Sequence, residues 1–346
     1  MLARIALASI LVVLTPSLAA CGDEAAEIAD GDVVRARADD QFTSGRRTTI
    51  TLPIGQLLVR APKPVDEAAA DETRSREAVS APSGSVLVPI TWQWDTWGSD
   101  RLGGIVDTRD TPHVDLVTED GRYRLPPPDQ DAVGGESFYV VVAGKAEERS
   151  LEIDFDGETQ TLDLVTGDRE EGRAAALYDI DEERLRKKDC SKETWFESRT
   201  VSAEFSCALI GPVLTPYAAG EWAPDGSLWL AVTLSTEMRI YGETNLFGTG
   251  ARYLATDVKV RPEIDGERPD LELSTEDDAD VCPIRSKYTC GWSKHLLFEV
   301  PEDDPEQGPL DLEVTYRLVL NNSWGNWDPP RRQRASAEET LKIWMD

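Results

Sequence analysis

Histidine is almost absent from this chain, whose 346 residues include only His113 and His295. Both lie within predicted strands. Histidine is the usual proton carrier and metal ligand near neutral pH. The motifs G-x-S-x-G and H-E-x-x-H and a glycine-rich phosphate loop are also missing. We therefore expect no enzymatic activity and no cofactor. A Ser-His-Asp group can be scattered along a sequence, so a hydrolase with an unrecognised site stays open as an alternative.

Positive charge is scarce as well. Lys and Arg number 36 against 65 Asp and Glu, which gives a formal net charge of −29. Nucleic-acid binding requires basic patches that neutralise phosphates, so we expect no nucleic-acid partner. The acidic runs at 276–280 and 302–306 lack the spacing of an EF-hand loop. We expect both runs to be solvated loops that hold no metal.

Long apolar runs are confined to the N-terminus. Residues 5–18 are apolar, but a membrane-spanning helix needs roughly 20 such residues. The run follows Arg4 and ends in Leu-Ala-Ala before Cys21, the charged, apolar, small-residue order of a secretory signal. The junction resembles a bacterial lipobox. We therefore expect lipidation of Cys21, with the lipid holding the chain on the membrane.

Cysteine is otherwise limited to Cys190, Cys207, Cys282 and Cys290. An even number in an exported chain predicts two disulfide bonds. Three pairings are possible. We favour Cys190–Cys207 with Cys282–Cys290, because each closes a short loop. No C-x-x-C pair is present, which disfavours zinc.

One segment occurs twice. APSGSVLVPIT at 81–91 returns as APDGSLWLAVT at 223–233, 142 positions later. Pro-x-Gly is turn chemistry, and the Val, Leu, Ile and Trp that follow it favour a buried strand. In the first copy Trp92 and Trp94 follow at period two, so they share a face that we expect to lie in the core or at an interdomain contact.

The flanking segments also match in the same order, so the repeat is longer than this segment. Strand-like or hairpin-like stretches correspond at 47–64 and 199–216, 113–125 and 257–273, 136–144 and 294–302, 150–155 and 310–318, and 159–165 and 339–345. Asp-Gly between alternating runs is a strong hairpin signal. Short strands with regular turns and no helical crossovers indicate antiparallel sandwiches. The chain is thus predicted to be all-β, a tandem duplication of one domain.

A Pro-Gly-Ser strand, the hairpin DGRY at 120–123, and later strands with FEVP and LEV resemble a known family. They are similar to the extracellular immunoglobulin-like domains found behind lipobox signals in Gram-positive, actinobacterial-type lipoproteins. The resemblance implies two tandem immunoglobulin-like antiparallel β-sandwiches and an extracytoplasmic, lipid-anchored location. It transfers no site residues. The first copy has no cysteines, so the fold itself does not need the disulfides.

The predicted organisation has five parts: a lipoprotein signal peptide at 1–20, a lipidated tether at 21–46, immunoglobulin-like domain 1 at 47–166, a linker at 167–188, and immunoglobulin-like domain 2 at 189–346. The tether is too polar and acidic to order itself. The linker has the spacing of a short helix. Residues 66–80 form a long loop that we expect to be disordered or briefly helical.

The last hairpin of the second copy carries the candidate binding surface. Residues 321–336 replace a tight DGE turn of the first copy and include Trp324, Trp327, Arg331, Arg332 and Arg334. Trp and Arg often dominate binding energy. In an immunoglobulin-like sandwich the loop at 241–252, with Phe247, lies at the same end. We expect Phe247, Trp324 and Trp327 to be anchors and Arg331 and Arg332 to be their polar rim. The alternative is that both tryptophans fold back onto the sandwich.

These observations predict a non-catalytic binding or scaffold protein that engages a protein partner at the cell envelope. A glycan- or small-ligand-binding module, with sugars or ligands stacked on exposed tryptophans, is the alternative.

Overall fold

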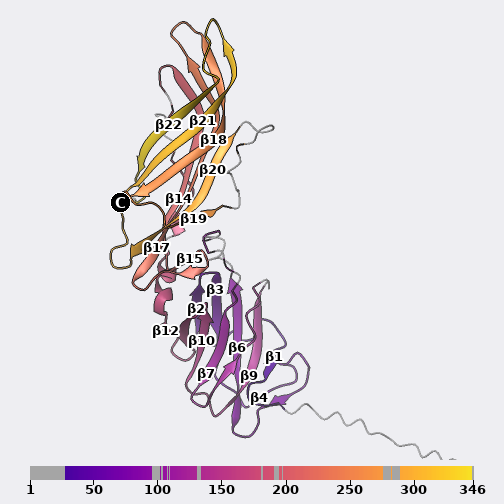
Figure 1. The fold of residues 1–346 in the computed structure, drawn as a ribbon. Coiled ribbons are helices and arrows are strands. Elements are labelled where there is room, and N and C mark those ends of the chain that lie inside the picture. Colours follow the sequence, from indigo (N-terminus) through magenta and orange to yellow (C-terminus); the bar gives the residue numbers. More distant parts are fainter. Residues whose placement is uncertain are drawn as a thin grey trace, which may run out of the picture.

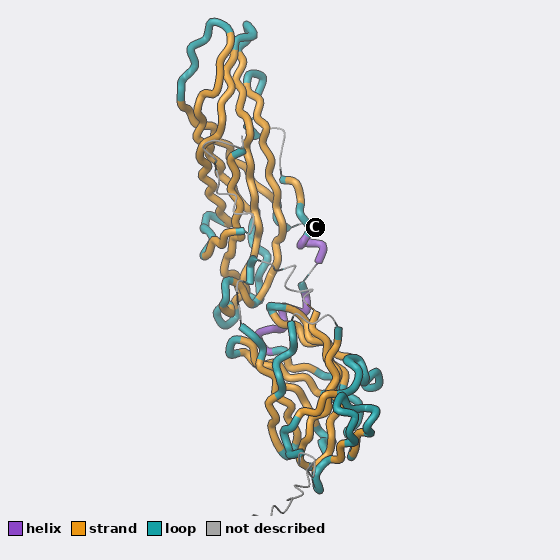
Figure 2. Tube along the Cα trace, turned by 90° about the vertical axis from the view of Figure 1, so that its right-hand side faces the viewer, coloured by secondary structure: helices purple, strands orange, loops and turns teal. Residues whose placement is uncertain are grey.

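The computed structural model describes residues 28–95, 102, 104–106, 108, 110–130, 134–180, 182–190, 195–196, 198–275, 282 and 289–344. This part of the chain is nearly all β and its sheets are antiparallel, so the predicted fold class is confirmed. Two sandwiches lie end to end (Figures 1 and 2). We call them the first sandwich, which contains β1 to β12, and the second sandwich, which contains β13 to β22. Cys21 and the predicted signal peptide lie outside the described residues.

Two five-stranded sheets form the first sandwich. One has the order β1-β9-β6-β3-β2, with bounds Val33–Arg35, Gly135–Ala143, Ser85–Asp95, Gly55–Arg60 and Arg47–Leu52. The other has the order β12-β11-β10-β7-β8, with bounds Arg169–Glu170, Glu158–Asp163, Arg149–Phe155, His113–Thr118 and Gly121–Arg124. Every second residue of β10 is buried, as expected for a strand with one face on the core.

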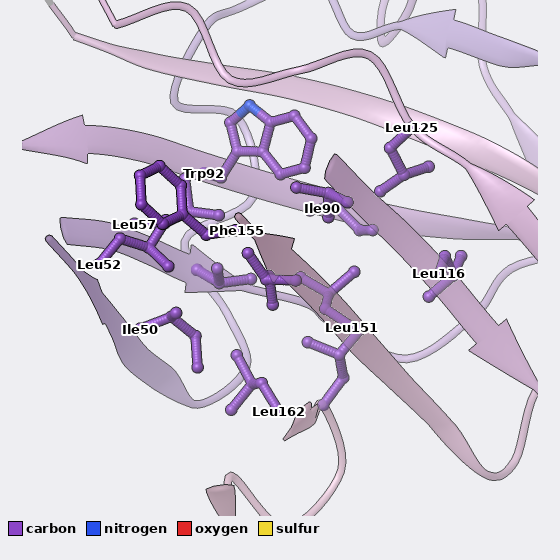
Figure 3. Close-up of a cluster of buried hydrophobic side chains, with 14 of the residues drawn as sticks. Ile50, Leu52, Leu57, Ile90, Trp92, Leu116, Leu125, Leu151, Phe155 and Leu162 are labelled. Carbon is purple, nitrogen blue, oxygen red and sulfur yellow. The ribbon is translucent and has the colours of Figure 1, made fainter. Parts of the chain in front are cut away.

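The core of the first sandwich lies between these sheets (Figure 3). Trp92 is 1% exposed and packs edge-on against Phe138 at a ring distance of 4.7 Å. Its indole N–H donates to the Glu136 carboxylate over 3.1 Å. Trp94 is buried in the same cluster. The prediction that the two tryptophans share a core face is confirmed.

The tether prediction is wrong for residues 28–46. β1 pairs with β9, and Ala36 and Phe42 pack with Leu87 and Tyr139 in a small cluster on the outer face of the sheet. The segment itself is polar, but the sheet beneath it supplies the apolar surface that it lacks. The average composition of the segment predicts disorder, because it gives little weight to the few apolar side chains, such as Ala36 and Phe42, that pack on the sheet.

Residues 66–80 are also ordered, contrary to the sequence prediction. They form a ribbon of β4 (Glu67–Ala68) and β5 (Val79–Ser80) that lies over the same outer face. Ala68 and Thr73 are buried. The Thr73 hydroxyl donates to the Glu77 carbonyl over 2.7 Å, which closes the loop inside the ribbon.

The predicted linker packs against the first sandwich over much of its length. β12 pairs with β11, and the 3₁₀ helix η1 (Gly172–Asp179) buries Ala174 and Leu177 in the first core. The Tyr178 hydroxyl donates to Gln160 over 2.6 Å and accepts the Thr51 N–H over 3.0 Å. A second 3₁₀ turn, η2 (Glu182–Leu185), follows.

The second sandwich has longer strands. One layer has the order β13-β14-β17-β20-β19, with bounds Lys188–Asp189, Val201–Thr215, Ser227–Thr244, Cys290–Pro301 and Leu271–Ser274. The facing layer has the order β18-β21-β22, with bounds Gly250–Ile264, Leu310–Trp324 and Arg332–Leu341. The far end of β17 pairs with β18, so this strand joins the two layers.

The turn at Asp265-Gly266 forms, but the hairpin predicted beyond it does not. β19 pairs with β20 of the other layer instead of returning along β18. Leu271 and Leu273 there pack on a cluster that includes Trp229 and Leu297. Packing of these half-buried leucines on the cluster goes with the different partner of β19.

The predicted disulfide pairing is confirmed. Cys190 is bonded to Cys207, and Cys282 is bonded to Cys290. Cys190 directly follows β13 and Cys207 lies on β14, so the first bond joins neighbouring strands.

The two copies of the repeated segment occupy the same place in their sandwiches. Ser85 faces Ala143 in the β6–β9 ladder, and Ser227 faces Pro301 in the β17–β20 ladder. These pairs follow the alignment predicted from the sequence. The closing turn bonds match as well: the Gly84 carbonyl accepts the Gly144 N–H over 2.8 Å, and the Gly226 carbonyl accepts the Glu302 N–H over 2.9 Å.

The two sandwiches also correspond in a short two-stranded ribbon. The second sandwich has a ribbon of β15 (Tyr217–Ala218) and β16 (Glu221–Trp222). It lies between the same two strands as the ribbon β4–β5 of the first sandwich. Ala68 faces Val79 in one ribbon, and Ala218 faces Glu221 in the other. The ribbon is therefore a shared part of both copies.

Candidate functional site

The two loops predicted to share one end of the second sandwich do so. Residues 245–249 join β17 to β18, and residues 325–331 join β21 to β22. Gly250 and Trp324 are partners in the β18–β21 ladder, and the Trp324 indole N–H donates to the Gly248 carbonyl over 3.0 Å. We call this end, residues 245–249 with 324–334, the distal tip (top of Figure 1).

Asn245 sets the shape of the shorter loop. Its side-chain oxygen accepts the Phe247 N–H over 2.9 Å and the Thr249 N–H over 3.1 Å. Asn side chains commonly build turns in this way. The turn leaves Leu246 82% exposed and Phe247 91% exposed. An apolar pair held so far out of the core is typical of a contact surface.

Close approach at Gly250 links the two loops. A Cβ on this residue would lie 2.3 Å from the Trp324 ring and 2.5 Å from the Glu243 carbonyl. Only glycine permits the ring to lie there. The Gln333 amide also donates to the Glu243 carboxylate over 3.1 Å. The tip is thus a braced structure that presents its side chains in fixed positions.

The five predicted surface residues gather at this tip, but they are not equivalent. Phe247 and Trp324 are exposed, whereas Trp327 is half-buried and packs against the second core. Arg331 and Arg332 are exposed. Phe247, Trp324 and the arginines therefore remain candidates for contact with a partner, whereas Trp327 contributes to the packing of the second core.

Sequence reasoning missed a second contact region, where the sandwiches meet. We call this region the joint. The Tyr217 ring is fully buried and packs edge-on against Phe155 of the first sandwich at 5.4 Å. Its hydroxyl donates to Asp156 over 3.1 Å, and the Trp222 indole N–H donates to the Phe155 carbonyl over 3.3 Å. β15 lies at this place in Figure 1.

Backbone bonds and apolar packing complete the joint. The Ile105 carbonyl accepts the Ala219 N–H over 2.7 Å, and the Val106 carbonyl accepts the Gly220 N–H over 2.9 Å. Ile105 is buried beside Trp229. The aromatic pair Tyr217 and Trp222 was the available signal in the sequence, but its partners Phe155 and Asp156 are distant in the chain.

The two histidines lie in different sandwiches. His113 is exposed at the start of β7. His295 is buried in β20, where Nδ1 lies 2.8 Å from the Thr233 hydroxyl and burial lowers the pKa of the imidazole. Each lies within a strand, as predicted, and they do not form one site.

The two disulfides indicate an oxidising, extracytoplasmic environment. None of the helices in the described ranges combines the length and apolar character needed to cross a bilayer. Within those ranges, no group of three or more His, Cys, Asp or Glu side chains is arranged to hold a metal ion. No protein-family model matches the chain, and the search of curated proteins finds no match.

Proposed function

We propose that the protein is a lipid-anchored, extracytoplasmic binding or scaffold protein of two immunoglobulin-like sandwiches. Its distal tip holds a protein partner at the cell envelope, and it performs no catalysis. One observation carries the proposal: the end of the first sandwich that corresponds to the tip is already occupied by a protein surface.

The joint and the tip are corresponding ends of the two copies. In the first sandwich the chain passes from β6 to β7 through residues 104–106, and from β10 to β11 through Asp156 and Gly157. These loops receive Tyr217, Trp222 and the Ala219-Gly220 backbone of the second sandwich. Their counterparts in the second sandwich are residues 245–249 and 325–331. The end of the first sandwich that corresponds to the tip thus already contacts a protein surface, that of the second sandwich.

Strand order supports the immunoglobulin-like assignment. In the second sandwich β14, β17, β20 and β19 face β18, β21 and β22. Read as A, B, E, D against C, F, G, this is the order of a constant-type immunoglobulin sandwich. The loops of the tip are then the B–C and F–G loops, which lie at the antigen-binding end of variable domains.

The composition of the tip favours a particular kind of protein partner. Leu246 and Phe247 offer apolar surface, and the exposed Arg331, Arg332 and Arg334 add positive charge to the same tip. The rest of the chain is strongly acidic. A partner with an apolar pocket bordered by carboxylates has the complementary chemistry.

Replacing Phe247 by alanine tests the tip. We expect a photo-crosslinking residue at position 247 to capture one discrete protein in intact cells, and one at Val65, an exposed position of the first sandwich, not to do so. Phe247→Ala should then weaken binding of that protein by about 30-fold, which corresponds to about 2 kcal/mol. Phe247 is 91% exposed, so the fold should be unaffected. Val65→Ala is the matched control, because Val65 is also an exposed apolar residue.

Equal capture from positions 247 and 65, or unchanged affinity in the folded Phe247→Ala protein, would contradict this use of the tip. Capture of saccharide instead of protein would establish the glycan-binding alternative.

Replacing Cys21 by serine tests the anchor. The thiol is the group that accepts the lipid, so Cys21→Ser should move the protein from the membrane fraction to the soluble fraction. Intact mass of the wild type should exceed that of the peptide chain by a lipid. Wild-type protein with no added mass, together with unchanged fractionation of the variant, would refute lipidation.

A further inference from the structure

A basic cavity lies at the end of the first sandwich opposite the joint. Its volume is about 850 Å³, and its lining includes Arg46, Lys63, Lys145 and Arg149. Arg149 begins β10, whose other end, Phe155, is at the joint. Four cations around one cavity contrast with a chain that carries a net charge of −29.

Arg149 lies at the base of this cavity and is only 8% exposed. Its guanidinium donates to the Ala146 carbonyl over 3.1 Å and to the Pro62 carbonyl over 3.2 Å. Its Nε is buried with no acceptor. A buried cation that has only carbonyl partners and an unsatisfied donor attracts an anion.

In the part of the chain that the structure describes, no carboxylate forms an ion pair with these cations. None of the ion pairs among the described residues includes Arg46, Lys63, Lys145 or Arg149. Burial lowers the pKa of Arg149, while the charges of Asp163 and Glu119 raise it, and a guanidinium stays protonated at neutral pH.

The acidic groups nearby are largely engaged elsewhere. The Asp163 carboxylate accepts the backbone N–H groups of Val165 and Thr166, and Glu119 accepts the Glu147 N–H. Glu147 itself lines the cavity and is the one carboxylate among its lining residues.

The cavity wall is partly apolar. Pro62, Pro64 and Leu164 line it, as does Val165, which is 50% exposed. Apolar side chains beside unpaired cations match a molecule that has both an anionic group and a hydrocarbon part.

The position of the N-terminus indicates where such a molecule is found. The Val141 carbonyl accepts the Gly31 N–H over 2.8 Å, and the Ser85 hydroxyl donates to Asp30 over 2.7 Å. The chain therefore enters the first sandwich beside the start of β6, at the end that holds the cavity. Six residues lie between Cys21 and Ile28, so the Cα atoms of these two residues are at most about 25 Å apart. If Cys21 is anchored as proposed above, this end is held near the bilayer.

We propose that this cavity binds the phosphate group of an anionic membrane lipid. The two exposed lysines hold the phosphate, Arg149 supplies fixed positive charge behind it, and the apolar wall faces the glycerol and upper acyl region. The acidic body is repelled by an anionic surface, so this contact sets which end of the molecule faces the membrane.

Vesicle binding by the mature chain from residue 21, carrying Cys21→Ser to remove the lipid, tests the proposal. We expect this protein to sediment with phosphatidylcholine vesicles that contain phosphatidylglycerol, and not with phosphatidylcholine alone. Adding Lys63→Gln and Lys145→Gln should weaken this binding by about 30-fold. The control pair Lys259→Gln and Lys342→Gln makes the same change in net charge on the second sandwich and should have little effect.

Competition with inorganic phosphate tests whether the anion that binds the cavity is a lipid headgroup or free phosphate. Failure of millimolar phosphate to displace the protein from the vesicles supports the lipid as ligand. Binding of inorganic phosphate without any binding to vesicles overturns the lipid proposal, as does equal weakening by the control pair or no binding to either. Capture from position 247 should be the same in the Lys63→Gln, Lys145→Gln variant, so failure of the cavity and failure of the tip are separate results.

Discussion

Tyr217→Ala is expected to lower the free energy of unfolding by about 3–5 kcal/mol, the range for removal of a large buried aromatic side chain. The ring comes from the second sandwich but is packed in the first core, against Phe155. Its loss therefore weakens the joint as well as the core. We expect denaturant unfolding to change from one transition to two, and small-angle scattering to show a broader range of interdomain distances.

The matched variant is Tyr217→Phe. It keeps the ring and removes only the hydroxyl that bonds to Asp156, which should cost about 1 kcal/mol and leave the joint rigid. A Tyr217→Ala protein that unfolds in one transition at the wild-type midpoint would show that the joint does not depend on this ring.

Alkaline pH is expected to unfold the second sandwich and open the joint. Burial raises the pKa of Tyr217 to about 12, and Asp156 adds to the rise. Burial, with the nearby charge of Glu243, likewise raises the pKa of Tyr241 to about 12. A tyrosine in the unfolded chain has a pKa of about 10. The unfolded chain thus loses these protons first, and stability falls as pH rises between about 10 and 12.

Each of the two tyrosines should contribute about 2 kcal/mol to this loss at pH 12, a large part of the 5–15 kcal/mol that usually stabilises a domain. Circular dichroism and phenolate absorbance should change together over this pH range. Tyr241→Phe should raise the midpoint of alkaline unfolding and change stability little at neutral pH. An alkaline unfolding midpoint of Tyr241→Phe that equals the midpoint of the wild type would contradict the prediction.

The correspondence between the strands of the two sandwiches could be predicted because the chain repeats itself. Aligning Ser85 with Ser227 and Ala143 with Pro301 places four strands at once, and the structure has both ladders in that register. The matching turns can be recognised from the local sequence, because Gly84 and Gly226 both adopt the positive φ that favours glycine.

Residues whose order depends on a distant surface could not be placed from sequence. Phe42 and Thr73 lie in polar segments, and they are ordered because strands β6 and β9 offer them an apolar outer face. The same limit applied to the joint, where Tyr217 and Trp222 find partners more than 60 positions away. At the tip, exposure of Phe247 followed from its loop, whereas the half-burial of Trp327 depends on packing across strands.

The β15–β16 ribbon fills the joint. Its sequence affects whether copies of the molecule can associate head to tail into a polymer. A surface that accepts the next copy head to tail propagates into a filament unless one end is altered. Tyr217 and Trp222, which fill the joint, correspond to Glu67 and Ser80 in the ribbon of the first sandwich. That ribbon is also eight residues longer and is folded onto its own sheet. The ribbon of the first sandwich therefore has no aromatic pair that could fill the tip of another copy as Tyr217 and Trp222 fill the joint, and we expect the purified protein not to form head-to-tail filaments.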